Sequence, residues 1–317
     1  MNDSPDVSVV MSVYNGAEHL RETLDSILAQ EGVAFELIVV DDGSTDQSTM
    51  ILEEYASRDE RVRVFQQENQ GLTRSLMRGC SEARGKYVAR HDVGDTSDPK
   101  RLLLQTSALD KVSDLAFVSC WTEFCGPEWE FLYLVKGTGR AASPVHIISE
   151  TEKNGTIDGP TCHPSVMFRM QSYERVGGYR AEFRYAQDWD LWYRLGEAGK
   201  LLTLQRPLYK ARLVPDSISS CNKQEQSAMG WLALEALLQR RRGLSEDAVL
   251  DKVRSVRAIN RKRASARIQA KWLYFIGECL RRNNDRRSLN YFAKSIRMYP
   301  LNLESWLKLL QTSVHSW

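Results

Sequence analysis

The 317-residue sequence lacks the features that would place it in a membrane or in a secretory pathway. No apolar run approaches the roughly 18 residues that a membrane-spanning helix needs. Residues 1–6 are polar and acidic, whereas a signal peptide begins with a basic and then an apolar segment. We therefore expect a cytoplasmic protein that is at most peripheral to the inner face of the membrane.

The cysteines lack the spacing of a metal or redox site. No two are separated as in a CxxC motif, and none has a histidine at the spacing of a zinc ligand. We expect reduced, buried thiols. The six cysteines stand at positions 80, 120, 125, 162, 221 and 279.

Strong net charge is also absent, because the formal total is only +2. The charge is unevenly spread, however. Residues 240–297 hold 17 Lys and Arg against 5 Asp and Glu, a local +12, which leaves the remainder near −10. This basic segment suggests contact with an anionic membrane, and the alternative is a solvated helix face. We expect no nucleic-acid partner.

Apolar patterns alternate between strand and helix over the first 110 residues. Strands are expected at residues 7–14, 35–40, 62–65 and 87–90, with amphipathic helices between them. Such alternation predicts an α/β fold with a mostly parallel sheet flanked by helices. A chain of this length has room for one large domain and a smaller one.

Acidic residues follow two of these strands directly. Asp41 and Asp42 end the second strand, and Asp92 and Asp95 follow the fourth. In open parallel sheets, ligands bind beyond the carboxyl ends of the strands, and carboxylate oxygens suit hard cations. The sequence therefore predicts a charged ligand at this edge, although Asp and Gly are also common in solvated turns.

Seven segments, in order, resemble the family-2 glycosyltransferases of the GT-A fold. They are VVMSVYN (9–15), VVDDGSTD (39–46), NQG (69–71), ARHD (89–92), HPSVMFR (163–169), GGY (177–179) and AQDWDLW (186–192). The resemblance covers about residues 6–215. It implies a GT-A domain over 1–220, with a nucleotide-binding half at about 6–110 and an acceptor half at about 111–220.

The resemblance implies a set of nucleotide-binding residues. Asp41 matches the acid that recognises the base, and Tyr14 matches a position lining the nucleoside pocket. Asp92 matches the acid that meets the ribose. His163 corresponds to a segment under the donor phosphates, and Arg74, with Arg90, is placed to aid the pyrophosphate. For Tyr14, Arg74 and His163 the alternatives are ordinary packing or surface roles, and Asp42 is expected to cap the following turn.

The metal-binding motif of the family departs from its usual form here. Where relatives commonly have Asp-x-Asp-Asp, this chain has Asp92-Val93-Gly94-Asp95, so the usual ligand is replaced by Gly94. Two outcomes are open. Asp95, with Asp92, holds Mg²⁺ or Mn²⁺, since Mg²⁺ needs only one or two carboxylates beside substrate phosphates. Otherwise arginine neutralises the leaving diphosphate.

The resemblance also implies the catalytic base. Family-2 enzymes invert the anomeric centre, and Asp188 matches the carboxylate that takes the proton of the acceptor hydroxyl. The alternative for Asp188 is simple capping of a helix. Gln187 replaces the usual Glu, so no raised pKa is expected from that neighbour. Asp190 is expected to be structural, while Trp189 packs the helix or stacks on an acceptor sugar.

The last third of the chain, residues 221–317, is predicted to be helical. Residues 288–307 resemble one tetratricopeptide-like hairpin, and a single hairpin cannot form a solenoid.

The expected activity is an inverting transfer from a nucleotide-sugar, with UDP-sugar as the first choice. The acceptor is a hydroxyl of a glycan or polyprenyl-linked acceptor in surface polysaccharide synthesis, with residues 120–160 on the acceptor side. One alternative is a non-catalytic nucleotide-sugar binding protein of the same fold. A nucleotidyltransferase is disfavoured because the turn after the first strand lacks a glycine-rich, basic phosphate loop.

Overall fold

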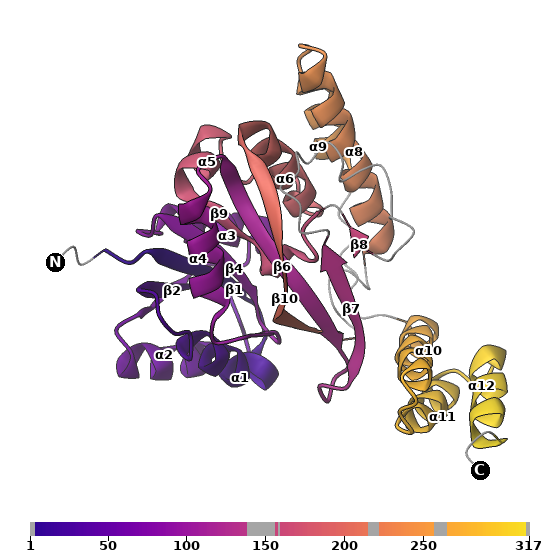
Figure 1. Ribbon diagram of the computed structural model, residues 1–317. Coiled ribbons are helices and arrows are strands. Elements are labelled where there is room, and N and C mark those ends of the chain that lie inside the picture. Colours follow the sequence, from indigo (N-terminus) through magenta and orange to yellow (C-terminus); the bar gives the residue numbers. More distant parts are fainter. Residues whose placement is uncertain (1–3, 138–155, 158, 215–221, 257–264, 315–317) are drawn as a thin grey trace. The chain divides into compact units, whose positions relative to one another are not determined.

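The chain forms an α/β sheet followed by a group of helices, as the computed structural model shows (Figure 1). It describes residues 4–137, 156–157, 159–214, 222–256 and 265–314. The strands are β1 (Val7–Val13), β2 (Phe35–Asp41), β3 (Val62–Gln66), β4 (Tyr87–Asp92), β5 (Thr96–Ser97), β6 (Leu115–Cys125), β7 (Phe131–Gly137), β8 (Thr156–Ile157), β9 (Met167–Arg169) and β10 (Lys200–Arg212). The helices are α1 (Ala17–Leu28), α2 (Ser48–Arg58), α3 (Leu72–Ser81), α4 (Arg101–Lys111), α5 (Met170–Arg175), α6 (Gln187–Ala198), α8 (Lys223–Arg241), α9 (Asp247–Ser255), α10 (Ala266–Arg282), α11 (Ser288–Met298) and α12 (Leu303–Val314), with a 3₁₀ turn η2 at His163–Ser165.

The sheet has the order β3-β2-β1-β4-β9-β6-β10-β5, and β7 pairs with β6 and β8. Its first four strands are parallel, as the alternating pattern predicted. β9 runs antiparallel to both β4 and β6, so the sheet continues beyond its parallel part with antiparallel pairs. Antiparallel pairs need no crossover helix between neighbouring strands, which is why the strand-helix alternation fades after β4.

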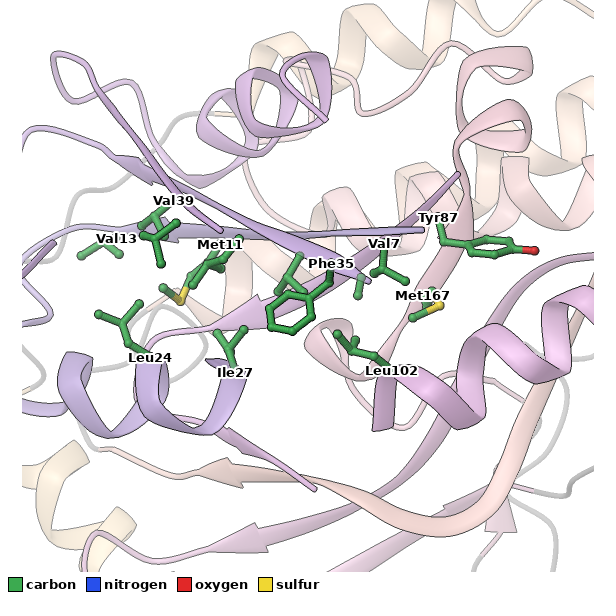
Figure 2. Packing of buried hydrophobic residues seen from close by; sticks show 14 of the residues in the cluster. Val7, Met11, Val13, Leu24, Ile27, Phe35, Val39, Tyr87, Leu102 and Met167 are labelled. Carbon is green, nitrogen blue, oxygen red and sulfur yellow. The ribbon is translucent and has the colours of Figure 1, made fainter. Parts of the chain in front are cut away.

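Both faces of the parallel part are buried. On one face, β1 and β2 pack against α1 and α4, where Met11, Leu24 and Leu102 lie in one cluster (Figure 2). On the other face, Val10 and Ile38 pack with side chains of α3 and α6. Two-sided burial explains the nearly continuous apolar sequences of β1 and β2.

The strand register brings the predicted acidic residues to one edge. Val13 of β1 pairs with Asp41 of β2, and Ser12 pairs with Asp92 of β4. The loops that follow these strands therefore start at the same level beside each other.

Helix α9, and helix α8 from residue 227 onward, belong to the unit formed by residues 1–122, 135–210 and 227–257. Met229 and Leu237 of α8 lie in one apolar cluster with Phe183 and Tyr193. Glu246 accepts hydrogen bonds from Arg180 (2.7 Å) and Arg240 (2.5 Å). These contacts cover the segment that leads into α6.

A second unit comprises residues 123–134, 211–226 and 258–317. α10 and α11 form a helical hairpin, in which Gly277 lets the ring of Phe292 approach the α10 backbone closely. The Tyr291 hydroxyl donates to Glu130 over 2.6 Å. Part of the predicted basic segment, residues 257–264, lies outside the described residues. No helix in the described ranges is long and apolar enough to cross a membrane.

Candidate active site

The loops after β1 and β2 are joined by hydrogen bonds between their polar residues. Asn15 accepts from the Thr45 N–H at 2.7 Å and donates its own N–H to the Ser44 hydroxyl at 3.0 Å. The Asp46 carboxylate accepts from the Ala17 N–H at 3.0 Å. These bonds fix the rim beside Tyr14, a residue that is 55% exposed and available to a ligand.

Asp41 lies buried at the end of β2. One carboxylate oxygen accepts from the Ser44 N–H at 3.0 Å, and the other accepts from the Thr49 hydroxyl at 2.6 Å. Each carboxylate oxygen has two lone pairs, so these bonds orient Asp41 without using its full accepting capacity.

Asp42 holds a different turn from the one expected. Its carboxylate accepts from the backbone N–H groups of Gln70 (2.9 Å) and Gly71 (2.8 Å), which precede α3. The role is structural, as predicted, but it is Asp41 rather than Asp42 that caps the turn at Ser44. Arg74 lies exposed on the first turn of α3.

Arg90 and Asp92 form an ion pair at the end of β4. The Arg90 side chain is almost fully buried, whereas the Asp92 carboxylate is 38% exposed. A buried guanidinium that pairs with a carboxylate restricts the rotamer of the acidic side chain. Asp92 is therefore presented to solvent in one orientation.

Asp95 turns towards the interior. Its carboxylate accepts from the Tyr209 hydroxyl at 2.8 Å, and the same hydroxyl accepts from the Asp92 N–H at 3.2 Å. Gly94, which lies between Asp92 and Asp95 in the chain, has a φ of +93°. Residues other than glycine adopt this backbone conformation only at an energetic cost. Tyr209 thus holds this loop in place.

Arg101 connects the end of β4 with η2. Its guanidinium donates to the Arg90 carbonyl and the Pro164 carbonyl, both at 2.8 Å. His163, beside Pro164, makes a 2.8 Å hydrogen bond through Nε2 to the Tyr179 hydroxyl. Burial, and then the charge of Arg90, holds the pKa of His163 well below its usual value. His163 is therefore a neutral hydrogen-bonding group near pH 7.

Asp188 lies on the first turn of α6 and is partly buried. Its carboxylate accepts from the Trp189 N–H at 3.0 Å. The pKa of Asp188 is raised to about 6, chiefly by burial and to a smaller extent by the charge of Asp92, while the Trp189 N–H and Arg90 lower it. Gln187 is uncharged and adds nothing, as expected. A carboxylate with this pKa is ionised at neutral pH yet basic enough to accept a proton.

The structure brings several predicted residues into one electrostatic neighbourhood. Asp188 is close enough to Asp92 for their charges to interact, and Arg90 influences both Asp188 and His163. Asp41 and Tyr14 lie along the rim at the ends of β2 and β1. Arg74 has no described contact that ties it to this group.

Sequence reasoning missed three positioning residues, Arg101, Tyr179 and Tyr209. Tyr209 stands 117 positions from Asp92 along the chain. No local motif links residues so far apart, so only the fold reveals the contact. Asp190 is structural, as predicted, because it pairs with the buried Arg194.

The mixed sheet flanked by helices is a fold of the GT-A type. The chain belongs to glycosyl transferase family 2, whose model matches residues 8–177, and it is a glycosyltransferase.

Relatives agree with this assignment, and a solved structure agrees with the fold. The putative glycosyltransferase EpsE of Bacillus subtilis is 34% identical over 225 residues, covering 67% of this chain and 74% of that protein. The chondroitin synthase of Pasteurella multocida is 24% identical over 238 residues, covering 75% of this chain and 24% of that protein. The crystal structure of residues 1–349 of S. aureus TarS in complex with UDP has a TM-score of 0.51 and 19% identity, covering 97% of this chain and 88% of that one. This structural likeness shows the fold alone.

Proposed function

We propose that the protein is an inverting glycosyltransferase that moves a sugar from a nucleotide-sugar, with UDP-sugar as the first choice, to an acceptor hydroxyl. The observation that carries the proposal is Asp188, a partly buried carboxylate with a pKa of about 6 beside Asp92. The fold of UDP-bound TarS supports the choice of nucleotide. The similarity to a chondroitin synthase supports a role in polysaccharide synthesis.

In the proposed reaction, Asp188 takes the proton of the acceptor hydroxyl as its oxygen attacks the anomeric carbon. The bond to the nucleoside diphosphate breaks on the opposite face, so the configuration inverts. Ionised Asp188 is unfavourable where it lies, because burial and Asp92 both oppose its charge. Accepting the proton relieves this cost, which favours proton transfer in the transition state.

We assign the nucleotide to the rim formed by the ends of β1, β2 and β4. Asp41 would accept a hydrogen bond from the base, and Tyr14 would lie against the nucleoside. Asp92, fixed by Arg90, would meet the ribose. Arg74 and His163 would contact the diphosphate, His163 as a neutral hydrogen-bond donor.

Asp41→Asn is expected to weaken UDP binding by about 1 to 3 kcal/mol, the scale of an unsatisfied buried polar partner. Asparagine keeps the shape of the side chain and can still accept from the Ser44 N–H, so the fold should survive. Calorimetric titration with UDP measures the effect. Asp25→Asn, an exposed change at a residue paired with Tyr55, is the matched control. Equal affinity in both variants would show that the base is read elsewhere.

The residues at the end of β4 fit a divalent cation only with help from the substrate. Among the described residues, no three His, Cys, Asp or Glu side chains gather as a metal site. Asp92 is accessible, whereas Asp95 is buried and bonded to Tyr209. Mg²⁺ or Mn²⁺ would therefore be held by Asp92, with Asp95 as the second candidate, and by diphosphate oxygens. When bound, the cation would neutralise charge on the leaving diphosphate.

Mn²⁺ is expected to tighten UDP binding to the wild type, and Asp92→Asn should remove that gain. Asp95→Asn should reduce it as well if Asp95 is the second ligand. Paired calorimetric titrations with Mn²⁺ and with chelator measure both effects. UDP affinity that is indifferent to chelator in the wild type would refute the metal assignment and leave arginine as the neutralising group.

The acceptor is proposed to be a glycan or a polyprenyl-linked sugar. Trp189 follows the proposed catalytic base Asp188 and is partly exposed. Its ring packs against that of Trp192, with the centroids 5.6 Å apart. An indole face of this kind suits stacking on a sugar. Part of the predicted acceptor side, residues 138–155, lies outside the described residues. The alternative of a non-catalytic binding protein is not favoured, because the chain belongs to a family of glycosyltransferases.

A further inference from the structure

Helix α12 exposes its apolar face to solvent. Leu303, Trp306, Leu307 and Leu310 are spaced as i, i+3, i+4 and i+7, so they share one face of the helix. With Leu301 just before the helix, they range from 45% to 76% exposed. We call these five residues the α12 stripe. Isolated exposed leucines are ordinary, but a contiguous row of this size marks an interaction surface.

The opposite face of α12 carries the packing contacts. Ser305 is fully buried, and its hydroxyl lies 2.8 Å from that of Ser295 on α11. Asn302 also donates to the Ser295 hydroxyl at 3.0 Å. The helix is thus docked through small polar groups while its larger apolar side chains face outward. This is the reverse of the usual arrangement for a surface helix.

The charge of the surrounding helices indicates what covers the stripe. Residues 265–314 contain nine Lys and Arg against three Asp and Glu, a net +6. Lys294 and Arg297 on α11 are exposed. A second copy would bring the same positive charge and be repelled, whereas an anionic surface is attracted. An exposed apolar row containing tryptophan, in a group of helices with a net positive charge, matches a helix that lies in a lipid interface.

We propose that the α12 stripe is the docking surface for an anionic lipid bilayer, with the stripe inserted at the level of the headgroups and the basic residues near lipid phosphates. The proposal narrows the membrane-facing part of the chain to residues 265–314. It does not depend on the transfer chemistry, because none of these residues belongs to the proposed active site.

Sedimentation with lipid vesicles tests the proposal on the full chain. The wild type should bind vesicles of phosphatidylethanolamine and phosphatidylglycerol, bind phosphatidylcholine vesicles weakly, and lose binding as salt rises. The double variant Leu307→Glu/Leu310→Glu should bind the anionic vesicles with an affinity at least about tenfold lower. Both leucines are exposed, so its thermal unfolding and UDP binding should match the wild type.

The matched control is Leu238→Glu/Leu244→Glu, which places the same charges at exposed leucines of the other unit. It should bind anionic vesicles like the wild type. Equal binding by the α12 variant, or no vesicle binding by the wild type, would overturn the proposal. A wild-type dimer that the α12 variant converts to a monomer would overturn it too, by assigning the stripe to a second copy. Loss of UDP binding in every protein would instead count against the proposed function alone.

Discussion

Asp188→Asn is expected to slow sugar transfer by about a hundredfold or more, the usual scale for loss of a general base. Asparagine has nearly the shape of aspartate, and its oxygen can still accept from the Trp189 N–H. It cannot take the proton of the acceptor hydroxyl. Initial rates of nucleoside diphosphate release in the presence of acceptor measure the effect, and UDP affinity should stay unchanged.

The thermal stability of Asp188→Asn at two pH values shows whether a loss of activity comes from misfolding. The pKa of Asp188 in the folded protein is about 6, above its unfolded value of about 4. The stabilising contribution of the protonated carboxyl is therefore present below about pH 4 and is lost as the pH rises through 6. Asp188→Asn should unfold at a higher temperature than the wild type at neutral pH and at a similar temperature near pH 4. A variant that is inactive because it is unstable would show the opposite.

Asp190→Asn, two residues further along α6, is expected to lower the free energy of unfolding by about 3 to 5 kcal/mol, the cost of breaking a buried ion pair. The side chains of Asp190 and Arg194 are 1% and 3% exposed. The Arg194 guanidinium also donates to the carbonyls of Val176 (2.7 Å) and Gly178 (2.6 Å). Removing the carboxylate charge leaves that guanidinium buried without its counter-charge. Urea unfolding at neutral pH measures the loss.

A double-mutant cycle isolates the ion pair from other effects. Arg194→Gln alone should also destabilise the protein, and the double variant should lose clearly less than the sum of the two single changes. Additive losses would mean that the two side chains do not stabilise each other. The two substitutions on α6 are thus expected to have different effects: Asp188→Asn lowers activity, and Asp190→Asn lowers stability.

The parallel half of the fold could be predicted because its signals are local. β1 and β2 are nearly continuous apolar segments, and each is followed by polar residues that mark where the strand ends. Since parallel strands align their carboxyl ends, the grouping of Asp41 and Asp92 at one edge followed from the strand positions alone. The register of β1 with β2 and β4 bears this out.

The antiparallel half and the support of the site could not be predicted in this way. β9 has only three residues, and its place between β4 and β6 depends on pairing with strands distant in sequence. Arg101 reads as an ordinary helix residue, yet it is buried and joins the Arg90 and Pro164 carbonyls. A buried polar side chain needs hydrogen-bond partners, which here are backbone carbonyls. Which carbonyls lie within reach is known only from the fold.

The dependence of kcat/KM on pH tests the assignment of Asp188 most directly. The donor is first identified by nucleotide release from a panel of UDP-, GDP- and dTDP-sugars, and transfer is then followed from about pH 4.5 to about pH 8.5. Because Asp188 must be ionised to act as a base and its pKa is about 6, the rate should rise tenfold per pH unit at acidic pH and level off above about 6. The residual activity of Asp188→Asn should lack this rise. A wild-type profile that is flat through this range, or a variant that keeps the same rise, would contradict the account.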